Sequence, residues 1–292
     1  MRIIDFRVRP PSRGFLNMVM YTNADRRDRF TRQLGLEPAR SATAQSMELL
    51  LKEMGSCGVS AGIVPARVSD YFGSVSNDDV AAICADHPGI FFGMAAVDPS
   101  NRRRAITQID QAISVGFRGV TIEPGAYPLP LYADDRRLYP IYAHLEDRDI
   151  VTVIMTGGNA GPDLSYSDPI TLDRVAADFP HLRIVVSHGG WPWVNHYLHI
   201  AYRRPNVYLS PDMYFHNTPG MSDYINAADS WLAERILFAT AYPLVPLQEY
   251  AEWFKKLPLK SENMKKITCT NALELLRINE SEITWLSDHS LL

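Results

Sequence analysis

The chain has 292 residues, of which 46% are hydrophobic and 21% charged, with a formal net charge of −4 at pH 7 and a pI near 6.1. This length allows one large core and one or two domains. The acidic balance argues against a nucleic-acid partner, which needs a basic face, and no apolar run approaches the roughly 20 residues that span a bilayer. We therefore expect neither nucleic acid nor a membrane as a partner.

The cysteines and the N-terminus bear on the compartment. Cys57, Cys84 and Cys269 are widely spaced and form no Cys-x-x-Cys pair. An odd, sparse set of this kind is typical of reduced, buried thiols, and the first residues run directly into a strand pattern without a signal region. The expectation is a cytoplasmic protein without disulfides.

Along the chain, apolar runs of strand length alternate with stretches of helical length, which is typical of a parallel sheet built from βα units. The predicted strands are residues 2–8, 59–64, 90–95, 119–122, 150–154, 183–187, 207–209 and 236–238. The main predicted helices are residues 42–54, 77–85, 103–115, 138–147, 171–179 and 247–256.

Eight such runs, none followed by Gly-x-Gly-x-x-Gly, predict an α/β protein with a closed (β/α)8 TIM barrel. We expect one domain over residues 1–292, in which residues 277–292 form a C-terminal tail. Residues 11–38 are polar and rich in arginine, and they are predicted to form a long irregular loop after the first strand.

Three strand ends carry a family resemblance. The chain opens with Met1-Arg-Ile-Ile-Asp-Phe-Arg-Val-Arg-Pro10, and later strands end in Ser187-His-Gly-Gly-Trp191 and Phe238-Ala-Thr-Ala-Tyr-Pro243. In this order they resemble the amidohydrolase-related (amidohydrolase 2) family of TIM-barrel hydrolases and decarboxylases. The resemblance extends from Ile3 to about Leu276, and shared order is stronger evidence for fold than for chemistry.

The resemblance implies a metal site whose ligands are mostly replaced. The family usually carries His-x-His on strand 1, a His on strand 5, another on strand 6, and an Asp after strand 8. Here these positions read Arg7, Arg9, Met155, His188 and Ala241, so only the histidine of strand 6 remains. A guanidinium has no lone pair and repels a cation. We therefore expect no metal in the family position and no cofactor.

The replacements predict an anion site instead. Arg7 and Arg9 are two residues apart, so both face the barrel mouth, where they form with His188 a site suited to a carboxylate or phosphate. The alternative is a structural network in which the arginines pair with Asp5 or Glu123 and only fill the vacated space.

Candidate catalytic residues are His188, Glu123 and Asp212. His188 would act as a general acid or base, the alternative being a family relic held by hydrogen bonds. Glu123 would serve as a base or, slightly preferred, as the counter-ion of an arginine. Together with His216 these residues also leave open a rebuilt site for one divalent metal that uses His188.

Aromatic residues complete the expected pocket. Trp191, Tyr214 and His216 are candidate substrate-binding residues, and the tyrosines of the mouth loops suit an aromatic or unsaturated substrate: Tyr127, Tyr132, Tyr214 and Tyr242.

The expected function is hydrolysis, or decarboxylation, of a small anionic carboxylate, cyclic or aromatic, without the usual metal. Hydrolysis of a C–O or C–N bond is preferred, and the metal-free lactonases of the resembled family imply that a metal-independent enzyme is possible. The alternative is a catalytically degenerate barrel that binds an anionic metabolite or serves as a non-enzymatic subunit. The expected partner is a small anionic substrate, and the sequence leaves open a homo-oligomer.

Overall fold

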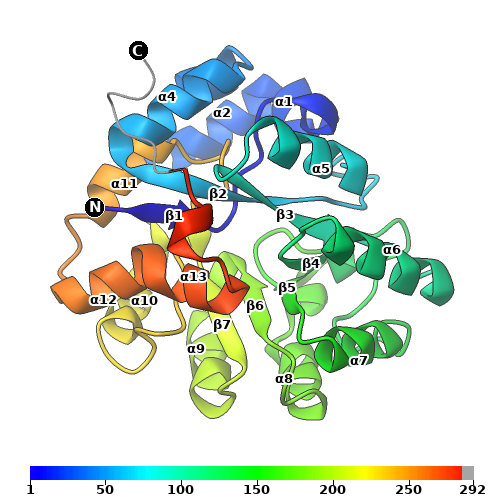
Figure 1. Cartoon of the computed structure of the whole chain (residues 1–292). Coiled ribbons are helices and arrows are strands. Elements are labelled where there is room, and N and C mark those ends of the chain that lie inside the picture. The colour runs from blue at the N-terminus through cyan, green and yellow to red at the C-terminus, as the bar shows by residue number, and fades with distance from the viewer. Residues whose placement is uncertain (285–292) are drawn as a thin grey trace.

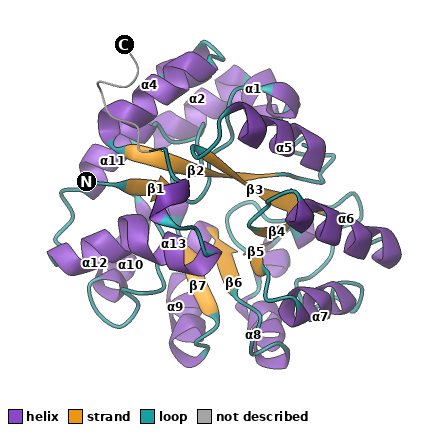
Figure 2. Ribbon diagram, viewed as in Figure 1, coloured by secondary structure: helices purple, strands orange, loops and turns teal. Residues whose placement is uncertain are grey.

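The computed structural model describes residues 1–284. Seven parallel strands form one curled sheet in sequential order, a half-barrel with helices around it (Figures 1 and 2). The strands are β1 (Ile3–Asp5), β2 (Val59–Pro65), β3 (Phe91–Ala96), β4 (Gly119–Ile122), β5 (Val151–Met155), β6 (Ile184–Ser187) and β7 (Val207–Ser210).

Strand positions follow from apolar residues that are covered on both faces. Every residue of β2, β3 and β5 is buried, as expected where helices cover one face of a parallel sheet and the barrel interior the other. Each of these seven strands coincides with a predicted run, with end shifts that are largest at β1, where only Ile3–Asp5 of the predicted residues 2–8 form a strand.

The predicted eighth strand takes a different form. Residues 236–242 make single parallel bridges, Leu209 with Ile236 and Val8 with Tyr242, instead of a continuous ladder. The Phe6 backbone N–H also donates to the Phe238 carbonyl at 2.9 Å. The segment thus contacts both β7 and β1, but Ala241 has a φ of +57° and turns the chain out of extended geometry.

Helices surround the sheet (Figure 2). The α-helices are α1 (Val19–Thr22), α2 (Ala24–Gln33), α3 (Arg40–Thr43), α4 (Met47–Cys57), α5 (Asn77–Asp86), α6 (Arg102–Ser114), α7 (Tyr139–Asp147), α8 (Pro169–Asp178), α9 (Val194–Arg203), α10 (Met221–Ala228), α11 (Leu247–Phe254), α12 (Ser261–Lys265) and α13 (Asn271–Leu276). Short 3-10 turns among them include η2 (Pro124–Ala126), η3 (Leu164–Ser167) and η5 (Asp212–Phe215). The start of α5 is capped by a side chain: the Ser76 hydroxyl accepts from the Asp79 N–H.

Two predictions about the helices were wrong. The single helix expected over residues 42–54 is divided into α3 and α4, because Gln45 adopts a φ of +49° and Ser46 caps a new helix. Residues 11–38 are not irregular: they contain α1 and α2, and Asn23 caps the second by accepting from the Arg26 N–H. Short polar helices of this kind lack the apolar periodicity on which the prediction depended.

The barrel interior is closed at one end by the C-terminal region. Inward-facing residues of the strands, such as Ile4 and Phe6, form a core cluster with Leu273 and Leu276 of α13. The Thr284 N–H donates to the Gly89 carbonyl, just before β3, so this region covers the amino ends of the strands. The opposite end, where the strands finish, is therefore the mouth.

Two further observations concern membrane-spanning helices and the cysteines. Among residues 1–284, no helix is long and apolar enough to cross a membrane. The three cysteines are free thiols.

Candidate functional site

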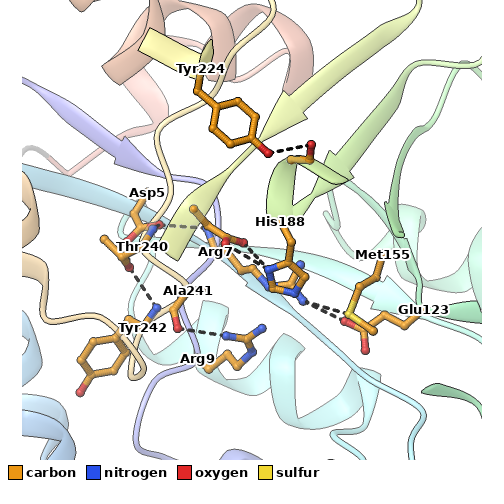
Figure 3. A network of polar contacts seen from close by, with 12 residues as sticks. Asp5, Arg7, Arg9, Glu123, Met155, His188, Tyr224, Thr240, Ala241 and Tyr242 are labelled. Atoms are coloured by element: carbon orange, nitrogen blue, oxygen red, sulfur yellow. Dashed lines mark hydrogen bonds and ion pairs between the residues drawn. The ribbon is translucent and has the colours of Figure 1, made fainter. Parts of the chain in front are cut away.

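The predicted site residues meet at the mouth. Arg7 and Arg9 follow β1, Glu123 follows β4 and His188 follows β6, and Figure 3 shows these side chains converging from their separate strands. Parallel strands bring residues that are distant in sequence to one rim, which is why strand-end residues form sites in barrels. Asp212, just past β7, belongs to the same group through its contact with His188.

Arg7 and Glu123 belong to a buried ion cluster with a third member. Glu123 Oε1 accepts from Arg7 Nη2 at 3.0 Å and from Arg67 Nη2 at 2.7 Å, while Arg67 Nε lies 2.5 Å from Oε2. Burial opposes ionisation, but Arg67 and Arg7 lower the pKa of Glu123 to about 2. These contacts favour the counter-ion interpretation of Glu123, since so weak a base accepts a proton poorly at neutral pH.

Arg9 differs from Arg7 in having no counter-ion. Its Nη1 donates to the Ala241 carbonyl at 3.2 Å, and no carboxylate within residues 1–284 forms an ion pair with it. Burial lowers the pKa of Arg9 well below its usual range, and Arg7 and Arg67 lower it further. Because a guanidinium stays protonated in proteins, this environment favours an incoming anion.

Asp5 is not the partner of either guanidinium. Its Oδ1 accepts from the backbone N–H groups of Arg7 and Thr240 at 3.0 Å each, and Oδ2 accepts from the Thr240 hydroxyl at 2.5 Å. Burial raises the pKa of Asp5 to about 7 against these hydrogen bonds. Asp5 thus links β1 to the segment after Ile236 by hydrogen bonds to Thr240, so its role is structural.

His188 and Asp212 form a buried dyad. His188 Nδ1 lies 3.0 Å from Asp212 Oδ1 and 2.9 Å from Oδ2, and Tyr214 packs edge-on against the imidazole. Burial lowers the pKa of His188, Asp212 raises it, and Arg7 and Arg9 lower it, so that the net shift is downward. With Nδ1–H directed at Asp212, the neutral ring keeps its lone pair on Nε2.

A cavity of about 340 Å³ opens beside this dyad. Its lining includes His188, Met155 and Tyr214 from the rim, and Arg9 and Arg67. Helix α2 covers it from one side and contributes three more arginines to the lining: Arg26, Arg27 and Arg29. Among the described residues that line the cavity, none is Asp or Glu, so the site is strongly cationic.

The aromatic candidates separate into two groups. Tyr214 lines the cavity and stacks at 4.6 Å on Trp191, which itself supports that wall from behind and donates from Nε1 to the Pro219 carbonyl. His216 lies outside this lining, with its ring 4.5 Å from Trp253.

The mouth-loop tyrosines are likewise spread out. Tyr242 is fully buried and its hydroxyl lies 2.8 Å from Ser41 Oγ, so it packs structurally. Tyr132 is 41% exposed and stacks on Tyr166, while Tyr127 is buried.

The donor set does not fit the metal that the family resemblance implies. Two strand 1 positions present guanidinium donors, and Glu123 is held by Arg7 and Arg67. Within residues 1–284, no group of three or more His, Cys, Asp or Glu side chains is arranged to hold a metal ion. The rebuilt set of His188, Glu123, Asp212 and His216 is not brought together as such a group.

Sequence reasoning missed four arginines of the site. Arg67 follows β2 by two residues and obeys the same strand-end rule that identified Arg7 and His188, so position alone could have found it. Arg26, Arg27 and Arg29 lie on α2, in the segment interpreted as an irregular loop, and their proximity to the mouth depends on tertiary packing.

Taken together, a curled parallel α/β sheet with a polar cavity at the carboxyl ends of its strands defines the TIM-barrel class of enzyme scaffold. Within that class, the chain belongs to the amidohydrolase family: the family model described as Amidohydrolase matches residues 4–278.

Relatives and solved structures agree with this assignment. A γ-resorcylate decarboxylase of Rhodococcus jostii is 26% identical over 251 residues, covering 70% of this chain and 76% of the relative. Another, from a Rhizobium species, is 23% identical over 278 residues and covers 81% of this chain and 85% of the relative.

Among structures, an uncharacterised TIM-barrel protein of Bordetella bronchiseptica, Bb4693, is 52% identical with a TM-score of 0.93, covering 95% of this chain and 99% of its own. A dihydroxybenzoic acid decarboxylase of a Polaromonas species, with bound manganese and 2-nitroresorcinol, shares the fold with a TM-score of 0.69 at 18% identity and covers 96% and 98% of the two chains.

Proposed function

We propose that this protein is an enzyme that converts a small carboxylate in the cationic cavity. One observation carries the proposal: Arg9, a buried cation for which residues 1–284 supply no ion-pair partner, lines the same cavity as His188 of the dyad. A carboxylate that binds Arg9 would supply the missing charge and lie beside a group able to move protons.

The charges near the dyad support an anionic substrate. Arg7, Arg9 and Arg67 bring three positive charges, whereas Glu123 and Asp212 bring two negative ones, and Arg26 and Arg29 add to the excess. The low-dielectric surroundings strengthen the attraction for an anion. In this assignment Glu123 holds Arg7 and Arg67 in place and takes no proton itself.

The protonation state of His188 favours hydrolysis of a C–O or C–N bond. A neutral imidazole whose Nδ1–H is directed at Asp212 can remove a proton from water at Nε2, and the water oxygen would then attack the carbonyl carbon of the substrate. When the tetrahedral intermediate collapses, the C–O or C–N bond would break, and the imidazolium would return its proton to the leaving oxygen or nitrogen. Arg67, which also lines the cavity, would stabilise the negative charge that develops on the carbonyl oxygen, while Arg9 holds the substrate carboxylate. Tyr214, supported by Trp191, would form the wall against the substrate; we assign no such role to His216.

A second candidate reaction is decarboxylation of an aromatic carboxylate, because the similar proteins of Rhodococcus jostii and the Rhizobium species are γ-resorcylate decarboxylases. That reaction needs a proton delivered to the ring carbon as CO2 leaves, so His188 would have to be protonated by the substrate or solvent before acting as the acid. The solved structure of the Polaromonas decarboxylase holds manganese. We propose that the present site works without a metal, because guanidinium groups stand at the family's ligand positions.

We further propose that residues 236–242 close the barrel as its eighth element and that the chain is one domain with a tail from residue 277. The bridges to both β7 and β1 support closure.

The test is turnover followed by proton NMR with a panel of lactones, amides and aromatic carboxylates. His188 has a φ of +62°, which asparagine tolerates, so His188→Asn removes the imidazole with little backbone strain. His196→Asn on the exposed face of α9 is the matched control. Acid release or ring opening indicates hydrolysis and a new aryl proton indicates decarboxylation, and both should vanish only in His188→Asn. Carboxylate binding without any turnover would establish instead the catalytically degenerate barrel.

A further inference from the structure

A second, larger hollow adjoins the cationic cavity. It has a volume of about 750 Å³ and shares three lining residues with the cavity, Arg26, Phe72 and Asn159. Its walls come from the turn after β2, from η2 and the residues behind it, and from the loop between β5 and η3. These segments all follow strand ends, so the hollow, hereafter the outer groove, extends the barrel mouth.

The outer groove differs chemically from the cavity. Its lining includes Tyr71, Phe72, Tyr127, Pro128, Pro130 and Leu164. Asp70 and Asp163 are also present, so the arginine excess of the inner cavity does not continue into it. A second acidic group on a ligand would therefore gain little here, whereas an apolar group would be buried against aromatic and proline surfaces.

Exposed apolar residues gather at this groove. Tyr71 is 63% exposed and Leu164 59%, and Leu129, between two lining prolines, is 66% exposed. Exposed apolar side chains that gather into one patch are typical of a ligand-binding groove or a protein contact.

Arg26 stands at the junction between the two spaces. Its Nη2 donates to the Tyr71 hydroxyl at 2.8 Å, and its guanidinium lies 5.2 Å from the centre of the Tyr71 ring. The contact joins α2 to the turn after β2 beside Phe72, whose ring also receives the Arg67 guanidinium at 4.9 Å. A ligand that passes from the cavity to the groove would therefore pass Arg26 and Phe72, which line both spaces.

We propose that the outer groove is a substrate subsite, and that the substrate is an extended carboxylate whose distal part is an apolar, aromatic group. This inference depends on the proposed function, since Arg9 must hold the carboxylate for the distal ring to reach the groove. The shared lining residues argue for one continuous ligand.

The experiment compares one-ring and two-ring acids by isothermal titration calorimetry. The probes are benzoate, biphenyl-3-carboxylate and biphenyl-4-carboxylate, so that the added ring is offered in two directions. Burying a phenyl ring should tighten binding of at least one biphenyl acid by about tenfold or more relative to benzoate. Leu164→Ala should weaken binding of that biphenyl acid by about threefold and leave the affinity for benzoate unchanged. The control is Ile170→Ala at the start of α8, where Ile170 is 57% exposed, and it should change neither affinity.

The outcomes separate the two proposals. If benzoate binds in an Arg9-dependent manner but neither biphenyl acid binds more tightly, the subsite is refuted and the proposed function stands. If Arg9→Met weakens the binding of none of the three acids, the proposed function itself fails. The groove could instead bind a second copy of the chain. Light scattering that gives a dimer mass, lost in Leu164→Asp, together with no gain from the second ring, would overturn the subsite in favour of a dimer contact.

Discussion

Replacing Arg9 by methionine should weaken carboxylate binding without unfolding the protein. The guanidinium lines the cavity and has one hydrogen bond, to the Ala241 carbonyl. A charge-assisted hydrogen bond to a ligand is worth roughly 1.5–3 kcal/mol net, so its loss should weaken binding of benzoate by about tenfold to a hundredfold. Arg9→Lys should restore only part of the affinity, because an ammonium cannot form the planar two-pronged contact.

The effect on stability should be small or favourable. Arg9→Met gives up one hydrogen bond, worth about 1 kcal/mol, but removes a buried cation that is close to Arg7 and Arg67 and has no ion-pair partner among residues 1–284. Arg7→Met is the contrasting variant, because Glu123 would keep Arg67 alone and a buried ion pair would be broken. The loss of this charge-assisted hydrogen bond should cost roughly 1.5–3 kcal/mol.

Calorimetry with benzoate and thermal melting of both variants would test this reasoning. The expected pattern is lost affinity with an unchanged or higher Tm for Arg9→Met, and a lower Tm for Arg7→Met. A clear loss of stability in Arg9→Met with unchanged anion affinity would refute the binding site and support a purely structural arginine network.

Three further predictions concern protons and metal. Because burial lowers the pKa of His188 and Asp212 raises it, NMR titration should place the His188 pKa below 6.5, and Asp212→Asn should lower it further; a rise would contradict the dyad. The pKa of Glu123 is about 2 in the folded protein and 4.5 ordinarily. The ionised carboxylate therefore adds on the order of 3 kcal/mol to the free energy of unfolding above pH 4.5, and this stabilisation is lost as the pH falls toward 2. Denaturant titrations from pH 6 to pH 3 should show this loss in the wild type and a flatter dependence in Glu123→Gln, and equal slopes would argue against the ion cluster. Purified protein should contain no stoichiometric manganese or zinc by elemental analysis and should keep its activity in EDTA, whereas activity that is lost in chelator and restored by manganese would refute the metal-free proposal.

The strand-end residues of the site could be predicted from sequence because parallel topology fixes them. Glu123 and His188 lie at the mouth because each directly follows an apolar strand, and Arg7 follows β1 by two residues, so no tertiary knowledge is needed beyond strand order. The local sequence does not predict which charged side chains form ion pairs. Glu123 binds two arginines because Arg67 approaches it from another strand, and no carboxylate of residues 1–284 pairs with Arg9.

The parts that sequence reasoning missed depend on long-range packing or local backbone geometry. Helix α2 has few apolar residues, so its helical start at Asn23 and its position over the cavity were not apparent. The predicted strand at residues 236–238 forms bridges only, since Thr240 is hydrogen-bonded to Asp5 and Ala241 adopts a positive φ. The Thr240–Asp5 contact joins residues 235 positions apart, which the local sequence does not reveal.

The most direct test of the central claim is a crystal structure of the protein soaked with the tightest-binding carboxylate, with anomalous data collected at the manganese and zinc edges. The proposal predicts the carboxylate on the Arg9 guanidinium, the rest of the ligand beside His188, and no anomalous peak at the dyad. A metal bound by His188, or a carboxylate that avoids Arg9, would contradict it.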